Sequence, residues 1–372
     1  MGRTFWNRFV MNDHLNYKNY QGLLVNGKSY EGVGQMEQLC QELASKGEDW
    51  SLSLVHFLSD WMAETQHIFI QTSGSTGVPK RIKVQKSAMV ASALKTIAFF
   101  NLQKNDKVLL CLSTQYIAGK MMVVRALVGG LDLIPVAVVS NPLQELDEVV
   151  EFAAMVPSQV HAILEENSVD LNRIKKLIVG GGAVSQSLKR QLKSVDVEAW
   201  ETYGMTETVS HIALRRIEDG EDERPFRCLE GVKIDQDDRG CLVISAPEIC
   251  DEKLVTNDLV HLQRSNQFVL LGRWDNVINT GGVKVFPELI EQKLSAHLNV
   301  SFVVVGLPDP FWGQKVVLVI ESDQEIELTD VHFLGLLDKF ERPKDVCFIA
   351  SFPRTSTGKV RRHQVIQLLL DQ

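Results

Sequence analysis

The stretch between Val108 and Val136 reads VLLCLSTQYIAGKMMVVRALVGGLDLIPV and indicates the class of fold. It opens with an apolar run, Val108–Leu112, and closes with another, Leu131–Val136, and both runs predict buried strands. Between them, Gly119–Val128 predicts a helix. Strand, helix and strand in succession are typical of a mostly parallel α/β sheet, in which ligands bind beyond the carboxyl ends of the strands. We therefore expect an α/β protein.

The alternation of strands and helices continues along the chain. We expect helices over Glu148–Met155, Ser158–Glu165 and Ser185–Lys193, with a strand over Leu177–Val179. The character of the sequence then changes at Gly272–Asp275, which is the candidate boundary of a second domain.

Beyond this boundary the sequence has the pattern of a small α+β domain. The expected helices are Glu288–His297, Asp330–Phe340 and Arg361–Leu370, and the expected strands are Phe302–Val305, Val316–Glu321 and Val346–Ala350. The pattern predicts a large N-terminal α/β domain, residues 1–273, with a small C-terminal domain, residues 274–372, hinged to it.

Composition narrows the class of protein. The chain has 372 residues and a formal net charge of -8, which argues against a nucleic-acid-binding surface. Its six scattered cysteines form no CxxC pair and indicate free thiols in a reducing compartment. No apolar run approaches the roughly 20 residues of a membrane span, and the N-terminus lacks the apolar core of a signal peptide. We expect a cytoplasmic protein.

The segment Gln71–Lys80, QTSGSTGVPK, predicts a phosphate-binding loop. It follows the apolar run His67–Ile70, so the loop leaves the end of a predicted strand. Gly74 and Gly77 allow backbone N–H groups to face an anion. Further donors are the hydroxyls of Thr72, Ser73, Ser75 and Thr76 and the ammonium group of Lys80. The spacing is not that of the GxxxxGK[ST] loop, and a polar turn between two strands is the alternative on composition alone.

Three more segments carry groups suited to a nucleotide. Val179–Ala183, VGGGA, follows a predicted strand and offers bare backbone to a flat ligand. Tyr203–Glu207, YGMTE, offers a ring that can stack on a base and a carboxylate that can hold Mg²⁺. Thr256–Asp258, TND, precedes an apolar strand, and a carboxylate there can accept both hydroxyls of a ribose. Taken alone, each segment is equally well an ordinary turn or a solvated carboxylate.

Near the C-terminus, Pro353–Arg362, PRTSTGKVRR, places Lys359 on a glycine-containing loop. Such a lysine can reach both a substrate carboxylate and a phosphate, and it would stabilise the charge that builds up when one attacks the other. A lysine beside two arginines is otherwise a solvated patch or a nucleic-acid contact.

In this order, from about residue 67 to residue 363, the segments resemble those of the adenylate-forming superfamily of acyl- and aryl-CoA ligases, firefly luciferase and peptide-synthetase adenylation domains. Gly272–Lys284, GRWDNVINTGGVK, resembles the hinge segment of that superfamily. The resemblance implies an ATP-dependent ligase that adenylates a carboxylic acid and transfers the acyl group to a thiol, with Mg²⁺ as cofactor and ATP and CoA as co-substrates.

The resemblance also implies a role for each matching residue. Lys359 would be the catalytic lysine, Thr206 would contact the α-phosphate and Glu207 would ligate Mg²⁺. The residues that would hold the phosphates are Thr72, Ser73, Gly74, Ser75, Thr76, Gly77 and Lys80. The residues that would hold the adenosine are Gly181, Gly182, Ala183, Tyr203, Asp258 and Arg273. Asp275 would be the hinge, and the residues that would line the CoA tunnel are Gly281, Gly282 and Lys284. Asn257 stands where the superfamily usually has glycine, and asparagine tolerates the turn that this implies.

The segment Ser113–Leu127 and the small size of the chain resemble the o-succinylbenzoate–CoA ligase family of menaquinone biosynthesis. The residues that would contact the acid are Tyr116, Gly119, Arg125 and Gly204. Arg125 would lie among apolar helix positions, where a charge invites a partner such as a second carboxylate of the substrate. A structural aspartate or a snorkelling side chain is the alternative. Tyr116 replaces the histidine of many relatives, and the N-terminal region is short for the family, so a homodimer would be one way to complete the site.

Other functions stay open at this stage. One is a ligase for another aryl or short-chain acid, or an enzyme that loads a carrier protein. Another is an inactive adenylate-binding protein, against which the retained polar set argues: Lys80, Glu207, Asp258, Arg273 and Lys359. A P-loop ATPase or a nucleic-acid ligase is disfavoured, because neither the GxxxxGK[ST] loop nor a basic surface is present.

Overall fold

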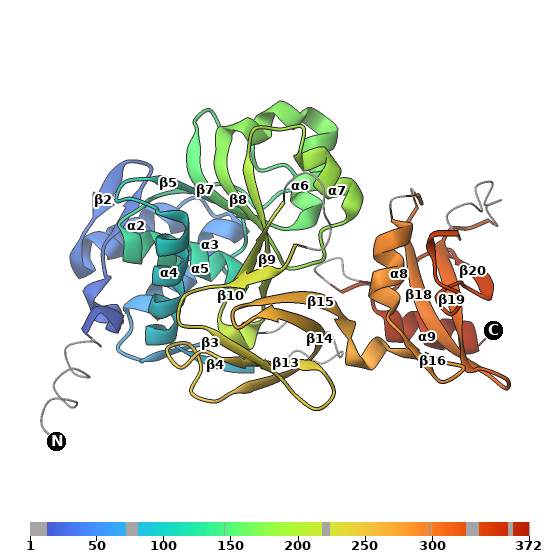
Figure 1. The fold of residues 1–372 in the computed structure, drawn as a ribbon. Helices are drawn as coiled ribbons and strands as arrows, with labels where there is room; N and C mark the ends of the chain where they lie inside the picture. The colour runs from blue at the N-terminus through green and yellow to red at the C-terminus, as the bar shows by residue number, and fades with distance from the viewer. Residues whose placement is uncertain are drawn as a thin grey trace, which may run out of the picture.

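The computed structural model describes residues 13–71, 81–144, 146–217, 224–295, 297–298, 300–324, 335–355 and 360–371. Its main feature is a mixed sheet of 13 strands, accompanied by a five-stranded sheet and a two-stranded hairpin. Figure 1 shows the C-terminal residues, drawn in orange and red, forming a smaller body beside the large sheet. The α/β class that the sequence predicts is confirmed.

One half of the large sheet is parallel. In spatial order its strands are β9 (Glu198–Gly204), β8 (Ile174–Val179), β7 (Val150–Met155), β5 (Lys107–Leu110), β6 (Asp132–Pro135) and β1 (Leu23–Val25). A short edge strand, β2 (Lys28–Tyr30), pairs antiparallel with β1. Helices connect most of the parallel strands, because a parallel crossover has to carry the chain back along the sheet.

The other half of the large sheet is antiparallel, which the sequence does not predict. Its strands follow β9 in the order β10 (His211–Arg216), β11 (Phe226–Cys228), β15 (Gln267–Arg273), β14 (Leu254–Arg264), β13 (Cys241–Ser245) and β12 (Lys233–Gln236). Tight turns such as the one at residues 237–240 reverse the chain between neighbouring strands. The expectation of a mostly parallel sheet therefore holds for one half only.

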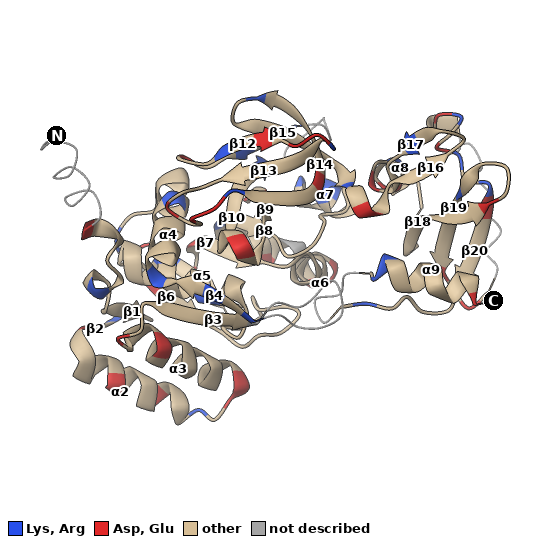
Figure 2. Ribbon diagram, turned by 90° about the horizontal axis from the view of Figure 1, so that it is seen from below, with Lys and Arg blue, Asp and Glu red and all other residues tan. Residues whose placement is uncertain are grey.

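Helices cover both faces of the parallel half (Figure 1). One face packs against α2 (Gly32–Ala44), α3 (Asp49–Met62), α4 (Lys86–Phe100) and α5 (Ile117–Gly129), and the other against α6 (Pro157–Asn167) and α7 (Gln186–Leu192). Strand alternation explains the two layers, because Val108 and Leu110 of β5 join the first cluster and Leu109 joins the second. In Figure 2, α2 and α3 lie side by side at the β2 end of the sheet.

The hairpin and the small sheet complete the fold. The hairpin pairs β3 (His67–Gln71) with β4 (Arg81–Gln85) and flanks the predicted phosphate loop, whose residues 72–80 lie outside the described part of the chain. The small sheet contains β16 (Ile278–Thr280), β17 (Val283–Val285), β18 (Phe302–Asp309), β19 (Gly313–Glu321) and β20 (Asp345–Ile349). Its helices are α8 (Pro287–Leu294) and α9 (Arg362–Leu370).

Short 3₁₀ turns lie between the longer elements of the described chain. They are η1 (Asp13–Leu15), η2 (Tyr17–Asn19), η3 (Ser168–Arg173), η4 (Thr206–Thr208) and η5 (Trp274–Asn276). The last of these joins β15 to the small sheet, at the place where the character of the sequence changes.

One expected helix is wrong, and a second is tested only in part. Val150–Met155 is the strand β7, whose residues are buried on both faces of the sheet, so its apolar run has no strand-like alternation to read. The expected helix Asp330–Phe340 lies partly outside the described residues, and its described part, residues 335–340, contains no α-helix. The remaining expected helices and strands are present with small changes at their ends.

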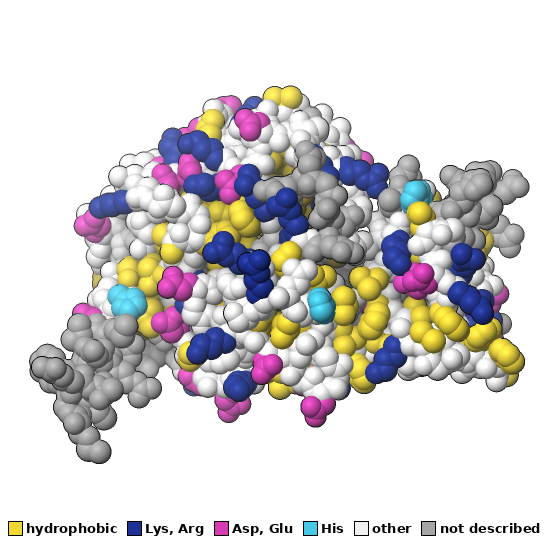
Figure 3. All heavy atoms as spheres, in the orientation of Figure 1, with side chains coloured by type: hydrophobic (Ala, Val, Ile, Leu, Met, Phe, Trp, Pro, Cys, Tyr) yellow, Lys and Arg dark blue, Asp and Glu magenta, His cyan; other side chains and the backbone are white. Residues whose placement is uncertain are grey.

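The described residues bear on three compositional expectations. No helix among them is both long and apolar enough to cross a membrane. All six cysteines lie in described segments and are free thiols, and burial raises the pKa of Cys111 to about 12. On the face shown in Figure 3, basic side chains are interspersed with acidic and apolar ones.

Candidate active site

Tyr203, at the carboxyl end of β9, joins the two halves of the large sheet. Its phenol donates a hydrogen bond to Oδ2 of Asp258 at 2.6 Å. The other oxygen of Asp258, Oδ1, accepts from Nη1 of Arg273 at 3.2 Å, across the pairing of β14 with β15. Burial, followed by the charge of Asp258, raises the pKa of Tyr203, so the phenol stays protonated and remains a donor. Three residues predicted to hold the adenosine therefore lie together.

The position of Asp258 corrects the sequence prediction. The sequence predicts Asp258 just before a strand, whereas β14 begins at Leu254 and places Asp258 within it. The register between β14 and β15 shifts directly afterwards, between Leu259 and Val260. Such an irregularity turns the side chains of a strand, and it occurs where this carboxylate faces the neighbouring strand end.

Asp275, the predicted hinge residue, is tied to the large sheet by two side chains. The Asn257 amide donates to both carboxylate oxygens of Asp275 at 3.2 Å, and Nη2 of Arg273 approaches Oδ2 at 2.9 Å. The side-chain oxygen Oδ1 of Asn257 in turn accepts a hydrogen bond from Nη1 of Arg239 at 2.9 Å. The residue that replaces the usual glycine thus makes contacts that glycine could not make.

Two residues predicted to contact the acid are glycines because the backbone passes close by. A Cβ atom on Gly119 would lie 2.3 Å from the carbonyl oxygen of Ser113, and one on Gly204 would lie 2.4 Å from the carbonyl oxygen of Ser210. Both distances are far inside van der Waals contact, so any other residue would force the chain apart. Tyr116, just before α5, is exposed.

Arg125 is the most unusual side chain near this region. It lies on α5, is 1% exposed, and donates from Nη2 to Oγ of Ser210 at 2.9 Å. Its Nε is buried with no hydrogen-bond partner, and among the described residues no carboxylate pairs with it. Burial lowers the pKa of Arg125 to about 9. Neither a structural aspartate nor a snorkelling arrangement explains this arginine within the described structure.

A chain of three polar residues, which the sequence does not predict, leads away from Arg125: Ser210, His211 and Thr96. Ser210 approaches Nδ1 of His211 at 3.4 Å, and Nε2 of His211 lies 3.2 Å from the hydroxyl of Thr96. Burial, followed by the charge of Arg125, lowers the pKa of His211 well below its usual range, so its ring is neutral at physiological pH. The sequence marks this group only weakly, since His211 lies four positions after Glu207 and directly before the apolar run Ile212–Leu214.

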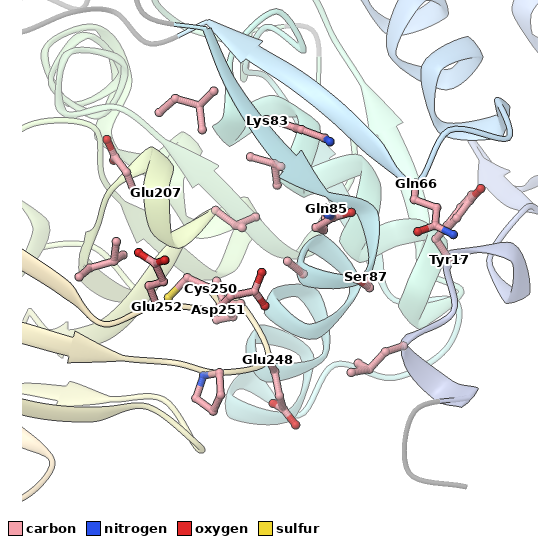
Figure 4. A pocket seen from close by; sticks show the side chains of 18 of the residues that line it. Tyr17, Gln66, Lys83, Gln85, Ser87, Glu207, Glu248, Cys250, Asp251 and Glu252 are labelled. Carbon is pink, nitrogen blue, oxygen red and sulfur yellow. The ribbon is translucent and has the colours of Figure 1, made fainter. Parts of the chain in front are cut away.

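Glu207 projects into a cleft of about 1070 Å³. The cleft runs between β4, η1 and η2 and the loop before β14, and Figure 4 shows Lys83 and Gln85 of β4 together with Glu207 and Glu252 around it. Among the described residues no three His, Cys, Asp or Glu side chains gather as a metal cage. An exposed single carboxylate suits a Mg²⁺ ion that takes its other ligands from water and phosphates.

The other predicted residues that the structure describes lie on three separate turns and on the strand β17. Gly181, Gly182 and Ala183 form an exposed turn after β8, and Thr206 opens η4. Gly281 and Gly282 form the turn between β16 and β17, on the small sheet. Lys284 lies on β17, and its ammonium group is 4.7 Å from the centre of the ring of Trp274, a residue of η5.

Lys359 and residues 356–358 lie outside the described part of the chain, but the two sides of their loop are well anchored. An antiparallel bridge joins Arg354 to Val360. The half-buried Arg362 side chain pairs with the Glu291 carboxylate at 2.9 Å and donates to the Val304 carbonyl oxygen at 2.6 Å. Burial raises the pKa of Glu291. These contacts place the described residues on either side of the segment 356–359.

A large sheet that brings this tyrosine, aspartate and arginine together, joined through η5 to a small α+β body, has the architecture of an adenylate-forming enzyme. Comparison with known proteins agrees. The family model described as AMP-binding enzyme matches residues 33–245. The chain belongs to the AMP-binding enzyme family, and it is an AMP-forming acid–thiol ligase.

Individual relatives are similar over most of the chain. The 2-succinylbenzoate–CoA ligase of Enterococcus faecalis is 27% identical over 349 residues, which cover 84% of this chain and 72% of that protein. An acyl-CoA synthetase (AMP-forming)/AMP-acid ligase II-like protein from Dyadobacter fermentans is 34% identical, with a TM-score of 0.60, and the match covers 89% of this chain and 98% of that one. The o-succinylbenzoate coenzyme A synthetase from Bacillus subtilis, in complex with ATP and magnesium ion, shares the fold at 18% identity and a TM-score of 0.71, over 89% of this chain and 82% of that one.

Proposed function

We propose that this ligase converts o-succinylbenzoate, ATP and CoA into o-succinylbenzoyl-CoA, AMP and pyrophosphate. The observation that carries the choice of acid is Arg125, a buried cation with a free N–H and no carboxylate partner among the described residues. o-Succinylbenzoate has two carboxylates, so one can react while the other neutralises Arg125. A monocarboxylic acid would leave the buried charge uncompensated, which is costly. The name of the Enterococcus faecalis relative supports the same acid.

The reaction proceeds in two steps. The reacting carboxylate attacks the α-phosphorus of ATP, the bond to pyrophosphate breaks, and an acyl-adenylate forms. The sulfur of CoA then attacks the acyl carbon and expels AMP. In the first step Lys359 would stabilise the charge on the attacking carboxylate and the α-phosphate, with Thr206 at the same phosphate. The loop of residues 72–77 and Lys80 would hold the β- and γ-phosphates.

The adenosine would lie against the Tyr203, Asp258 and Arg273 network. The Asp258 carboxylate would exchange its hydrogen bonds with Tyr203 and Arg273 for ribose hydroxyls, which its two oxygens can accept. The ring of Tyr203 would stack on adenine, beside the exposed Gly181–Ala183 turn. When bound, Mg²⁺ would neutralise phosphate charge, and the Glu207 carboxylate is the group that would ligate it.

CoA and the small domain would act in the second step. We propose domains over residues 1–273 and 274–372, with Asp275 as the hinge and the Gly281–Gly282 turn, with Lys284, along the path of the pantetheine arm. Domain rotation would exchange the Lys359 loop for this turn. The contacts of Asp275 with Asn257 and Arg273 belong to one of the two arrangements and would have to break in passing to the other.

A panel of acids tests the proposed substrate. Pyrophosphate release should be measured with o-succinylbenzoate, benzoate and short fatty acids, in the presence of ATP, Mg²⁺ and CoA. We expect kcat/KM for o-succinylbenzoate to exceed that for benzoate by at least about 100-fold, because breaking a buried charge pair costs about 2–5 kcal/mol. Preference for benzoate or a fatty acid would retain the ligase and reject the acid, and no release with any acid would indicate an inactive adenylate-binding protein.

A further inference from the structure

Arg125 stands at one end of a buried chain of hydrogen bonds that the roles above do not use. From Arg125 the chain passes to Ser210 at 2.9 Å, to His211 at 3.4 Å and to Thr96 at 3.2 Å. Thr96 donates its only hydroxyl proton to the Ser92 carbonyl oxygen at 3.2 Å. Arg125, His211 and Thr96 are buried, so water does not compete for these groups.

The proton positions along this chain follow from counting donors. With the Thr96 proton donated to Ser92, the Thr96 oxygen accepts from His211, and we assign the ring proton to Nε2 of His211 on this basis. The neutral ring then has a bare Nδ1, which can only accept. The Ser210 hydroxyl donates to Nδ1, and its lone pair is left for Arg125. This assignment gives every group between Arg125 and Ser92 one consistent role as donor or acceptor.

Protonation of His211 is opposed by its surroundings. The charged group that faces it is Arg125, and its other polar contacts come from Thr96 on α4 and Ser210 before β10. A proton on Nδ1 would place two cations together and remove the acceptor that Ser210 uses. The same histidine therefore stays neutral and keeps the Ser210 hydroxyl turned away from Arg125.

We propose that His211 is a positioning residue for the acid substrate. His211 orients the Ser210 hydroxyl, and Ser210 in turn holds Nη2 of Arg125. The unpartnered Nε of Arg125 is then left for a substrate carboxylate. This inference rests on the proposed function, since it requires an acid with a carboxylate beyond the reacting one. The Ser210 oxygen accepts a hydrogen bond from the guanidinium of Arg125. Its hydroxyl cannot donate to the substrate carboxylate while it donates to Nδ1 of His211. Selectivity for a dicarboxylic acid would then depend on a residue that does not touch it.

Kinetics of matched variants test this inference. His211→Leu removes the acceptor at similar size, His211→Gln retains an amide that can accept, and Ser210→Ala removes the relay. We expect H211L and S210A each to raise the KM for o-succinylbenzoate about tenfold, with KM for ATP unchanged, and H211Q to stay within about threefold of the wild type. Thermal unfolding of each variant shows whether it is folded.

The double variant S210A/H211L separates positioning from packing. If His211 acts through Ser210, the effects on acid KM will not add, and the double variant will match S210A. Additive effects, or equal losses in H211L and H211Q, would overturn the proposal, and so would an unchanged acid KM in folded H211L. These results differ from failure of the proposed function, in which the wild-type enzyme itself would not turn over o-succinylbenzoate.

Discussion

Replacing Lys359 with alanine is expected to slow adenylate formation by about 100-fold or more, while thioester formation from supplied acyl-adenylate and CoA stays near the wild-type rate. The reason is that the lysine charge matters where a carboxylate and a phosphate, both negative, approach each other, and removal of one such stabilising group typically costs a factor of this size. The second step starts from a neutral acyl carbon and has no such need for the lysine.

The two half-reactions can be measured separately. Pyrophosphate release without CoA reports the first, and CoA thioester formation from synthetic acyl-adenylate reports the second. Lys315→Ala is a matched control, because Lys315 lies on β19 of the same small sheet and its charge is paired with Asp345 at 2.6 Å. The control should change neither step. An equal loss of both steps in the Lys359 variant would reject this division of roles between them.

The surroundings of the loop make this test informative. The Arg354–Val360 bridge and the contacts of Arg362 with Glu291 and Val304 anchor both ends of the loop without Lys359. A change at Lys359 should therefore leave the small sheet folded, and the thermal unfolding temperature should stay within a few degrees of the wild type.

Replacing Arg125 with alanine is expected to raise the KM for o-succinylbenzoate by about 30-fold or more, as the loss of a buried charge pair costs about 2–5 kcal/mol. KM for ATP should change little, because Arg125 contacts Ser210 and none of the residues assigned to the nucleotide. The selectivity against benzoate should shrink, since benzoate has no second carboxylate to lose. Lysine at this position should restore only part of the binding, because it lacks the planar fork of donors.

Stability gives this prediction an independent readout. In the empty protein Arg125 is a buried cation without a carboxylate among the described residues, so its removal should not destabilise the fold and can raise the unfolding temperature. An arginine held for structural reasons would behave in the opposite way. An unchanged acid KM together with a lower unfolding temperature would take Arg125 out of the acid site.

Local patterns predict much of the fold, and long-range pairing explains what they miss. The strand, helix and strand around Arg125 follow from apolar runs and are present as β5, α5 and β6. The strand β7 is missed because burial on both faces removes the alternation that identifies a strand. The antiparallel half is missed because its hairpins depend on tertiary pairing as well as on turn residues.

The candidate site also contains residues that the sequence predicts and residues that it does not predict. Tyr203, Asp258 and Arg273 could be predicted as residue types at matching segments, and the structure brings them within hydrogen-bonding distance. His211 and Thr96 could not, because they are 115 positions apart in the chain and meet only when α4 packs on β10. A lone histidine beside an apolar run carries no indication of the hydroxyls that will surround it.

The most direct test of the proposed two-step reaction is to trap its acyl-adenylate intermediate. The enzyme is mixed with o-succinylbenzoate, ATP and Mg²⁺ without a thiol, quenched in acid and analysed by mass spectrometry, and CoA is then added to a second portion before the quench. We predict o-succinylbenzoyl-adenylate in the first portion, and AMP with the CoA thioester in its place in the second. Formation of ADP and phosphate, or of a thioester with no adenylate at any time, would contradict it.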